Sequence, residues 1–433
     1  MFNIKLNMLF FYFSSISIFL WLLIISCSIL PISLLLIILT AYLMIICVLL
    51  SYYTIKSNIN LFLILLLCLF IIITGIFITE NLLLFYILFE ASLIPMFLLV
   101  IGWGSRQEKT RAAYYLFFYT FISSILMLFS IIKFYILVGS INMDIAYITG
   151  VPVYFQKWGF ICMFIAFSVK VPMIPFHIWL PQAHVEAPLA GSILLAGIML
   201  KLGVYGFIRF AIPLYPQSTY YYAPLLLFLS IISIVYGGFS TIRQSDMKRL
   251  IAYSSVAHMG FATYALFTPK YSEYGIVGCY LILIAHGLVS PALFIVVGIL
   301  YERYHTRVIK YYGGLSHLMP KLTVFAFLFT LSSMAFPGTL NFLGEFYVIV
   351  VAINYSYGHA ILISVGCFVG LIYSLYFYQR IFTGSISSYL IKGKDLNKVE
   401  FISLLMLMFP VIILGVYPFN LITYISSPII SNV

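Results

Sequence analysis

Four charged residues lie inside long apolar runs of the sequence. Glu90 lies in LLLFYILFEASLIPMFLLV, Lys170 in FIAFSVKVPMIPF, Lys201 between SILLAGIML and LGVYGFI, and Glu345 in FPGTLNFLGEF. A charge at the centre of a membrane-spanning helix costs about 2.5–3.5 kcal/mol on insertion scales, so such residues are usually functional. Burial disfavours the charged form of a lysine and a nearby carboxylate restores it, so acids and bases placed in this way can pass protons. The alternative is a structural ion pair. Two acids and two bases on four runs, two of them beside proline-containing breaks, favour proton conduction.

Three further residues are candidates for the same chemistry. His258 and His286 lie inside apolar runs, where a histidine can be a hydrogen-bond partner between helices or a proton relay, and both readings stay open. Lys248 begins a run within RQSDMKRL, where a lysine whose ammonium reaches the membrane surface is the default expectation.

Metal and cofactor sites are not expected. The six cysteines lie singly within apolar runs without CxxC or Cys/His ligand spacing, which argues against disulfides and iron–sulfur clusters. The histidines supply no matched pairs for haem ligation.

The elements that carry these residues must be membrane-spanning helices. Of the 433 residues, 64% are hydrophobic and 8% are charged, too few polar side chains to cover a soluble globule. A span needs about 20 mostly apolar residues. We therefore predict an all-α polytopic membrane protein with about thirteen spans, at 8–30, 32–54, 59–79, 81–103, 112–138, 157–178, 188–212, 223–242, 248–267, 275–300, 321–350, 358–383 and 400–420.

The net charge of +11 follows the positive-inside rule and does not indicate a nucleic-acid partner. Outside the spans or at their ends, Lys157, Arg209 and Lys270 are assigned to one side of the membrane. The opposite side, which carries the N-terminus, receives 16 basic residues, namely Lys5, Lys56, Arg106, Lys109, Arg111, Arg243, Lys248, Arg249, Arg303, Arg307, Lys310, Lys321, Arg380, Lys392, Lys394 and Lys398. This asymmetry places the N-terminus in the matrix or cytoplasm and the C-terminus outside.

Two spans contain helix-breaking sequences, VPMIP at 171–175 and FPGT at 336–339. Proline removes a helical hydrogen bond, so we expect both helices to be discontinuous, with both breaks facing the bundle interior. The breaks are five spans apart, which fits two five-helix repeats in inverted orientation. We divide the chain into N-terminal helices (1–58), a first repeat (59–213), a second, inverted repeat (221–383), and a C-terminal loop and helix (384–433).

Several longer motifs resemble one family. NLLLFYILFEASLIPMFLLVIGWGS, AFSVKVPMIPFHIWLPQAHVEAPLAGSILLAGIMLKLGVYGFIRF, QSDMKRLIAYSSVAHMGF, IAHGLVSPALF with YERYHTR, and FPGTLNFLGEF are similar to the antiporter-like membrane subunits of respiratory complex I, in particular the chain 4 group, called subunit M in bacteria. The resemblance runs from about residue 60 to 383. The wider family includes the Mrp-type sodium/proton antiporters. Its complex I members usually have three spans where this chain has two, 8–30 and 32–54.

The resemblance implies a role for each candidate. Glu90 resembles the acid paired with the lysine of the first broken helix, here Lys170. Lys201 resembles the lysine that passes protons toward the centre. Four residues resemble those of the family's second half-channel. Glu345 resembles its terminal acid, and Lys248, His258 and His286 resemble its other polar residues.

The expected function is proton translocation within NADH:ubiquinone oxidoreductase of the mitochondrial inner membrane. The redox centres would lie in partner subunits, and this chain would carry no cofactor. Expected partners are other membrane subunits, neighbouring antiporter-like subunits among them, together with lipids, protons and water. An Mrp-type antiporter subunit and a structural subunit with an inactive channel are the alternatives.

Overall fold

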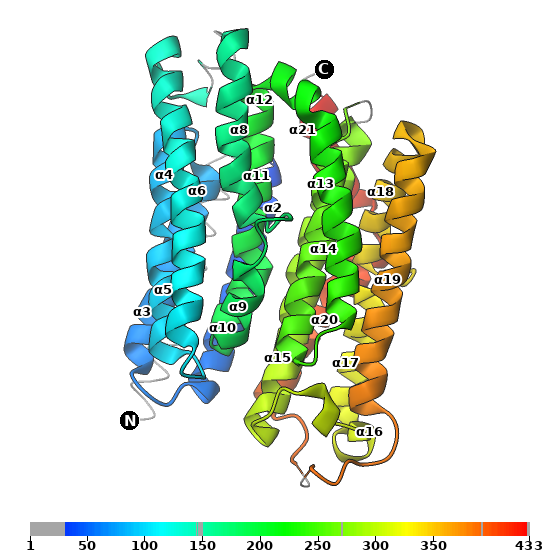
Figure 1. Ribbon diagram of the computed structural model, residues 1–433. Coiled ribbons are helices and arrows are strands. Elements are labelled where there is room, and N and C mark those ends of the chain that lie inside the picture. Colours follow the sequence, from blue (N-terminus) through cyan, green and yellow to red (C-terminus); the bar gives the residue numbers. More distant parts are fainter. Residues whose placement is uncertain (1–30, 144, 146–149, 270–271, 391–392, 431–433) are drawn as a thin grey trace.

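A computed structural model describes residues 31–143, 145, 150–269, 272–390 and 393–430, and these residues form a bundle of upright helices (Figure 1). Ten of its helices are long and apolar enough to cross a membrane, in addition to shorter apolar helices. The first predicted span, 8–30, lies outside the described residues. Each of the other twelve coincides with a helix or a set of consecutive helices. The predicted all-α polytopic fold is confirmed.

The first group of helices follows one edge of the bundle. Its members are α2 (Pro31–Thr54), α3 (Ile59–Ile78), α4 (Leu82–Ala91), α5 (Leu93–Trp103), α6 (Lys109–Val138), α8 (Val153–Lys170), α9 (Trp179–Glu186), α10 (Leu189–Leu194), the π-helical η1 (Leu195–Met199), α11 (Leu200–Gly206), the π-helical η2 (Phe207–Ala211) and α12 (Ile212–Leu214).

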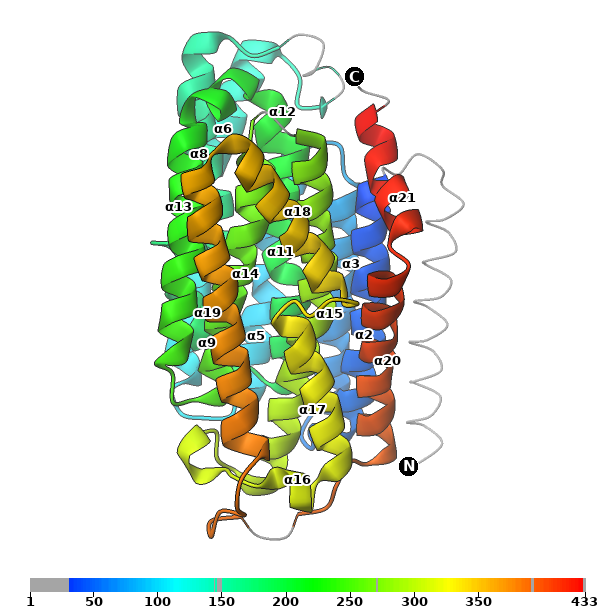
Figure 2. The same cartoon turned by 90° about the vertical axis from the view of Figure 1, so that its right-hand side faces the viewer.

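The second group lies beside the first. Its members are α13 (Pro216–Ile242), α14 (Met247–Phe267), α15 (Ser272–Tyr304), the short 3-10 helix η3 (Ile309–Tyr311), α16 (Leu315–Leu318), α17 (Pro320–Ser333), α18 (Leu340–Tyr355), α19 (Tyr357–Phe382), α20 (Lys398–Val416) and α21 (Phe419–Ile430). The helices run nearly parallel to the long axis of the bundle, and α20 lies beside α2 in the view turned by 90° (Figure 2).

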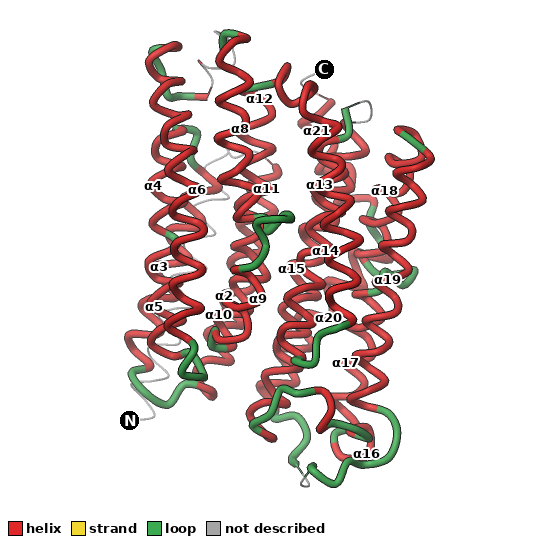
Figure 3. Tube along the Cα trace, viewed as in Figure 1, coloured by secondary structure: helices red, strands yellow, loops and turns green. Residues whose placement is uncertain are grey.

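The two discontinuous helices run in opposite directions. Passing from α8 to α9 the chain descends in Figure 1, whereas from α17 to α18 it ascends, and Figure 3 shows a loop at mid-height in each. This is the arrangement expected of inverted repeats, in which broken helices occupy corresponding positions of the two halves. The prediction of two discontinuous helices is therefore confirmed.

The first break is stabilised by side chains from two elements. The Trp179 indole N–H donates to the carbonyl oxygen of Val169 at 2.8 Å, and the Ile174 amide donates to Ser233 Oγ of α13 at 3.0 Å. Unwound backbone at membrane depth is tolerated where such groups find partners in the protein. Lys170 is the last residue of α8, at the helix end whose partial negative charge favours a cation.

The second break differs from our expectation. It covers residues 334–339, and Phe336 is 51% exposed, with Pro337 and Gly338 also at the surface of the chain. The expectation that both breaks face the interior is therefore wrong for the second break of the single chain, and at the first break Pro175 and Ile178 are exposed as well. The physical reason is the place of the second break in the bundle: α17 and α18 lie at an outer edge (Figure 2), where α20 contacts the loop through Gly415 but leaves residues 336–338 uncovered.

Some predicted runs are divided in ways that packing decides. Ser92 interrupts the predicted span 81–103, and the predicted span 188–212 contains the two π-helical segments. The predicted span 400–420 ends at Val416, and the chain turns before Pro418 and starts α21, because a residue before proline is disfavoured in the helical conformation.

Sixteen basic residues were assigned to the side of the membrane that carries the N-terminus, and those of them that the structure describes do lie at one end of the bundle. They belong to the segments that join α2 to α3, α5 to α6, α13 to α14, α15 to α17, and α19 to α20 (Figure 1). We call this end the basic face.

Candidate functional site

Four of the predicted residues form one buried row across the middle of the bundle. Lys201 Nζ lies 2.9 Å from His286 Nδ1, the rings of His286 and His258 are 5.8 Å apart between centroids, and His258 Nδ1 lies 3.4 Å from Glu345 Oε1. Their exposed fractions are 0%, 3%, 7% and 7%, in the order Lys201, His286, His258 and Glu345. We call these four residues the central row.

Four helical segments position the central row: α11 carries Lys201, α15 carries His286, α14 carries His258, and α18 carries Glu345. The π-helical turn η1 ends just before Lys201, and the Lys201 ammonium turns back to donate to the carbonyl oxygen of Ala196 within η1. A π turn leaves such a carbonyl free because its i→i+5 pattern replaces the α-helical bonds locally.

Two glycines allow α15 to approach η1 closely at this point. A Cβ at Gly287 would lie 3.3 Å from the carbonyl oxygen of Gly197, so the backbones nearly touch one position away from His286. The close contact sets the short distance between Lys201 and His286.

Tyr373 of α19 adds a further polar side chain beside His258, in the part of the central row that belongs to the second group of helices. Its hydroxyl lies 3.2 Å from His258 Nε2, so both ring nitrogens of His258 have polar neighbours, Glu345 on one side and Tyr373 on the other. Tyr373 is buried. The sequence did not single it out, since a tyrosine within an apolar, tyrosine-rich run gives no signal of its own.

Glu90 and Lys170 lie near each other, but no salt bridge of 4.0 Å or less joins them. Lys170 is 1% exposed, and its Nζ has no hydrogen-bond partner among the described residues and lies 4.6 Å from the centre of the Phe89 ring. Glu90 is partly buried, and its carboxylate has a hydrogen-bonding contact with Ser124 and an electrostatic interaction with Lys170. Glu90 and Lys170, the pair predicted from the sequence, are thus neighbours, but they do not form a salt bridge in this conformation.

Lys248 lies apart from the central row, at the basic face. It is 4% exposed, so it is not the surface-reaching lysine that its place at the start of α14 suggests, and its Nζ donates to the carbonyl oxygen of Ala187 at 3.0 Å. The structure therefore brings Lys248 to the end of α9, and not to His258 on its own helix.

The family model described as NADH:quinone oxidoreductase/Mrp antiporter, TM, matches residues 79–370, which include every residue of the central row. The chain belongs to this family. Among the described residues, no group of three or more His, Cys, Asp or Glu side chains could hold a metal ion.

Curated relatives in the family carry one description. NADH-ubiquinone oxidoreductase chain 4 of Metridium senile is 48% identical over 398 residues, which are 92% of this chain and 81% of that protein. Chain 4 of Marchantia polymorpha is 45% identical over 388 residues, 89% of this chain and 78% of that protein.

Solved structures agree with the family. A chain of respiratory complex I from Thermus thermophilus superimposes with a TM-score of 0.85 at 30% identity, over 92% of this chain and 84% of that one. A chain of the Mrp complex from Dietzia sp. gives a TM-score of 0.83 at 17% identity, over 92% of this chain and 82% of that one, which shows likeness of fold alone.

Within the family fold, the buried ionisable residues that sequence reasoning missed include His184, Glu186 and Arg307. The His184 ring stacks on Phe294 at 4.6 Å between centroids, has no hydrogen-bond partner at either nitrogen, and interacts electrostatically with Lys248 and Lys201. It therefore lies between the basic face and the central row.

Glu186 and Arg307 form an ion pair, with 3.9 Å between Oε1 and Nη1. Glu186 is 4% exposed and Arg307 is 0% exposed. The segment LPQAHVEAP follows the first break directly, and its polar residues within an otherwise apolar stretch are the signal that could have identified His184 and Glu186. Arg307 lies in the connection after α15, where an arginine reads as a surface charge.

Proposed function

We propose that this chain is the chain 4 subunit of respiratory complex I and that its central row conducts protons. The observation that carries the proposal is the central row itself: four ionisable groups buried at membrane depth, contributed by both halves of the bundle. Buried ionisable residues inside a membrane protein are expensive and typically mark ion pathways. The 48% identity to a chain 4 protein over most of both chains supports the assignment to complex I.

The geometry suggests how a proton moves along the row. His286 accepts a proton from Lys201 at Nδ1, 2.9 Å away, and releases its other proton from Nε2, which has no hydrogen-bond partner among the described residues. A water molecule can bridge the 5.8 Å between the two histidine rings. His258 then passes the proton to Glu345. An imidazole that takes a proton at one nitrogen and gives one from the other restores itself by exchanging tautomers.

Energy for this transport comes, in our proposal, from NADH oxidation and ubiquinone reduction in partner subunits, and this chain holds no redox centre of its own. Its place is the mitochondrial inner membrane. The exposed second break supports a partner beside α17 and α18, since unwound backbone facing lipid is not tolerated at membrane depth. A neighbouring membrane subunit at this edge would bury Phe336, Pro337 and Gly338.

Purification of the native complex through a tag on this chain tests the assignment. The expected result is an assembly far heavier than the chain, which reduces ubiquinone with NADH and takes up protons when reconstituted in vesicles. Sodium should have no effect on proton uptake. A complex that exchanges sodium for protons without NADH would establish the Mrp-type alternative, and normal proton uptake in an assembled Lys201→Met variant would establish an inactive channel in this subunit.

A further inference from the structure

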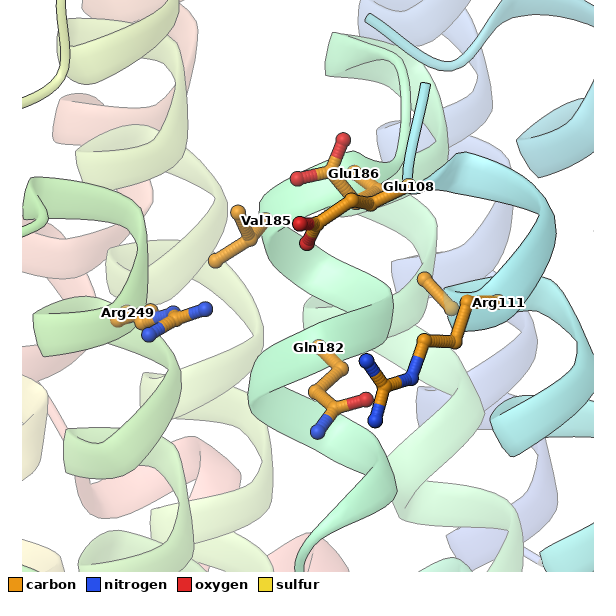
Figure 4. Close-up of a pocket in the computed structure, with 7 residues that line it drawn as sticks. Glu108, Arg111, Gln182, Val185, Glu186 and Arg249 are labelled. Carbon is orange, nitrogen blue, oxygen red and sulfur yellow. The ribbon is translucent and has the colours of Figure 1, made fainter. Parts of the chain in front are cut away.

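A small polar pocket opens at the basic face between α6, α9 and α14. It has a volume of about 120 Å³. Its polar lining consists of Glu108 and Arg111 at the start of α6, Gln182 and Glu186 on α9, and Arg249 on α14 (Figure 4). A pocket of this size accommodates several water molecules, because one water needs roughly 10–15 Å³.

The floor of the pocket contains a carboxylate that is incompletely paired. Glu186 Oε1 lies 3.9 Å from Arg307 Nη1, too far for a hydrogen bond, and Oε2 is buried without a hydrogen-bond partner among the described residues. The Arg307 guanidinium is occupied elsewhere: it donates to the carbonyl oxygen of Val185 and to Ser105 Oγ, and it lies 4.6 Å from the centre of the Tyr301 ring. Buried polar oxygens nearly always have a partner, and a small rotation of the side chain toward water in the pocket would supply one to Oε2.

Ionisable groups continue inward from this carboxylate. Lys248, whose Nζ is bonded to the Ala187 carbonyl next to Glu186 in the chain, interacts electrostatically with Glu186. His184, two residues before Glu186 on α9, interacts with both Lys248 and Lys201. Lys201 begins the central row. Electrostatic interactions thus lead from Glu186 to the row through two fully or nearly buried groups, Lys248 and His184.

We propose that this pocket is the port through which the central row exchanges protons with the aqueous phase at the basic face, with Glu186 as the group that binds the proton. The inference rests on the proposed function and adds a site to it. In uptake, the Glu186 carboxylate takes a proton from hydronium, which leaves as water. The resulting carboxylic acid gives that proton to the neutral amine of Lys248 or to a free nitrogen of His184, and Lys201 receives it next.

A purely structural role for Glu186, as the counter-charge of Arg307, makes a different forecast. Glu108, Arg111 and Arg249 line the pocket beside Glu186. Lys248 and Arg307 interact with Glu186, and Asp246, Arg106 and His184 interact with Lys248 in turn. A proton-binding role makes turnover depend on pH at the basic face, whereas a counter-charge role does not.

The first test is Glu186→Gln in the assembled complex, reconstituted so that the pH at each face can be set. Glutamine keeps the size of the side chain but cannot take up a proton. We expect proton translocation and the coupled quinone reduction to fall at least tenfold at pH 8 on the basic face, and to recover by roughly tenfold per pH unit of acidification while uptake limits the rate. Glu186→Asp should restore most of the rate. A pH-independent loss would overturn the proposal.

Glu400→Gln is the matched control. Glu400 belongs to another nearly buried arginine pair, 2.6 Å from Arg303, at the same face and outside the pocket. Any loss of activity in this variant should be the same at every pH. Lys201→Met is run in parallel: if it also pumps normally, the proposed function fails, whereas normal pumping in Glu186→Gln alone overturns only the port.

The second test does not depend on folding of a charge variant. In Gln182→Cys, a charged thiol reagent added to the basic face of the assembled complex should attach to the pocket wall and reduce proton translocation at least tenfold. Lys321→Cys, at an exposed position of the same face outside the pocket, is the control, and the unsubstituted chain treated with the reagent gives the baseline. Full labelling of Gln182→Cys with unchanged proton translocation would overturn the proposal.

Discussion

Lys170→Met separates proton transfer from structural stabilisation more sharply than any other substitution in the chain. Methionine keeps an unbranched side chain of similar length and removes the ammonium. A structural salt bridge would make the change costly, by about 3–5 kcal/mol, because an uncompensated buried charge would remain. No salt bridge of 4.0 Å or less joins Lys170 to Glu90, and Lys170 Nζ has no hydrogen-bond partner. What is lost is the interaction with the Phe89 ring at 4.6 Å, worth about 2 kcal/mol when desolvated, together with the electrostatic interaction with Glu90 beyond salt-bridge distance.

Against this loss stands the removal of an unpaired ammonium from a site that is 1% exposed, which is favourable by several kcal/mol on the scale of burial costs. We therefore expect Lys170→Met to assemble normally, to be at least as stable as the unsubstituted chain, and to lose most coupled proton translocation. The assays are the amount of assembled complex on native gels, its thermal inactivation midpoint, quinone reduction with NADH, and proton uptake in vesicles.

Lys157→Met is the matched control on the same helix. Lys157 Nζ lies 4.5 Å from the Tyr221 ring, almost the distance found at Lys170, but the side chain is exposed and far from the central row. The Lys157→Met variant should leave proton uptake unchanged. Normal proton uptake in assembled Lys170→Met would refute the proposed role, and loss of assembly in proportion to loss of activity would show that the lysine is structural.

Three further predictions concern the breaks and the central row. Trp179→Phe leaves the buried Val169 carbonyl unpaired and should lower the free energy of unfolding by about 1–3 kcal/mol, seen as a lower inactivation midpoint. Tyr373→Phe removes the hydroxyl beside His258 and should slow proton uptake about two- to tenfold, and it should cause no further loss when it is added to His258→Gln. Gly203→Ala would place a Cβ 2.6 Å from the side chain of Val171, directly after α8, so thermal inactivation should show a loss of about 1–3 kcal/mol.

The sequence predicted the spans and the breaks because both depend on local properties. Apolar length sets the spans, and prolines locate the breaks to within a few residues, although the first extends over 171–178. The π-helical turn η1 lay beyond sequence reasoning, because it lies at the glycine contact beside His286 and depends on packing between helices. The interruption at Ser92 did have a local signal: Pro95 lacks the amide that would bond to the Ala91 carbonyl.

Part of the candidate site was predicted because it depends on local properties of the sequence. The rest was missed because it depends on long-range packing. Glu90, Lys170, Lys201 and Glu345 stand out because each interrupts a long apolar run. Arg307 does not stand out, since the polar connection after α15 folds under α9 and buries it only through long-range packing. His184 and Glu186 lie in a segment whose depth depends on how the first break turns, and Lys248 becomes buried because the end of α9 covers it.

The exposed second break, residues 334–339, affects the stability of the chain before it assembles with neighbouring subunits. Most backbone amides of this segment donate to carbonyl oxygens, among them those of Ala335, Phe336 and Thr339, but residues 336–338 stay exposed. A non-helical segment at membrane depth is tolerated where protein covers it, so we expect a newly inserted chain to be less stable here until another subunit covers it. The half-life of newly made chain, followed by pulse labelling, should therefore shorten when synthesis of neighbouring subunits is blocked. Degradation of the excess chain would then keep the amount of this subunit matched to that of its partners.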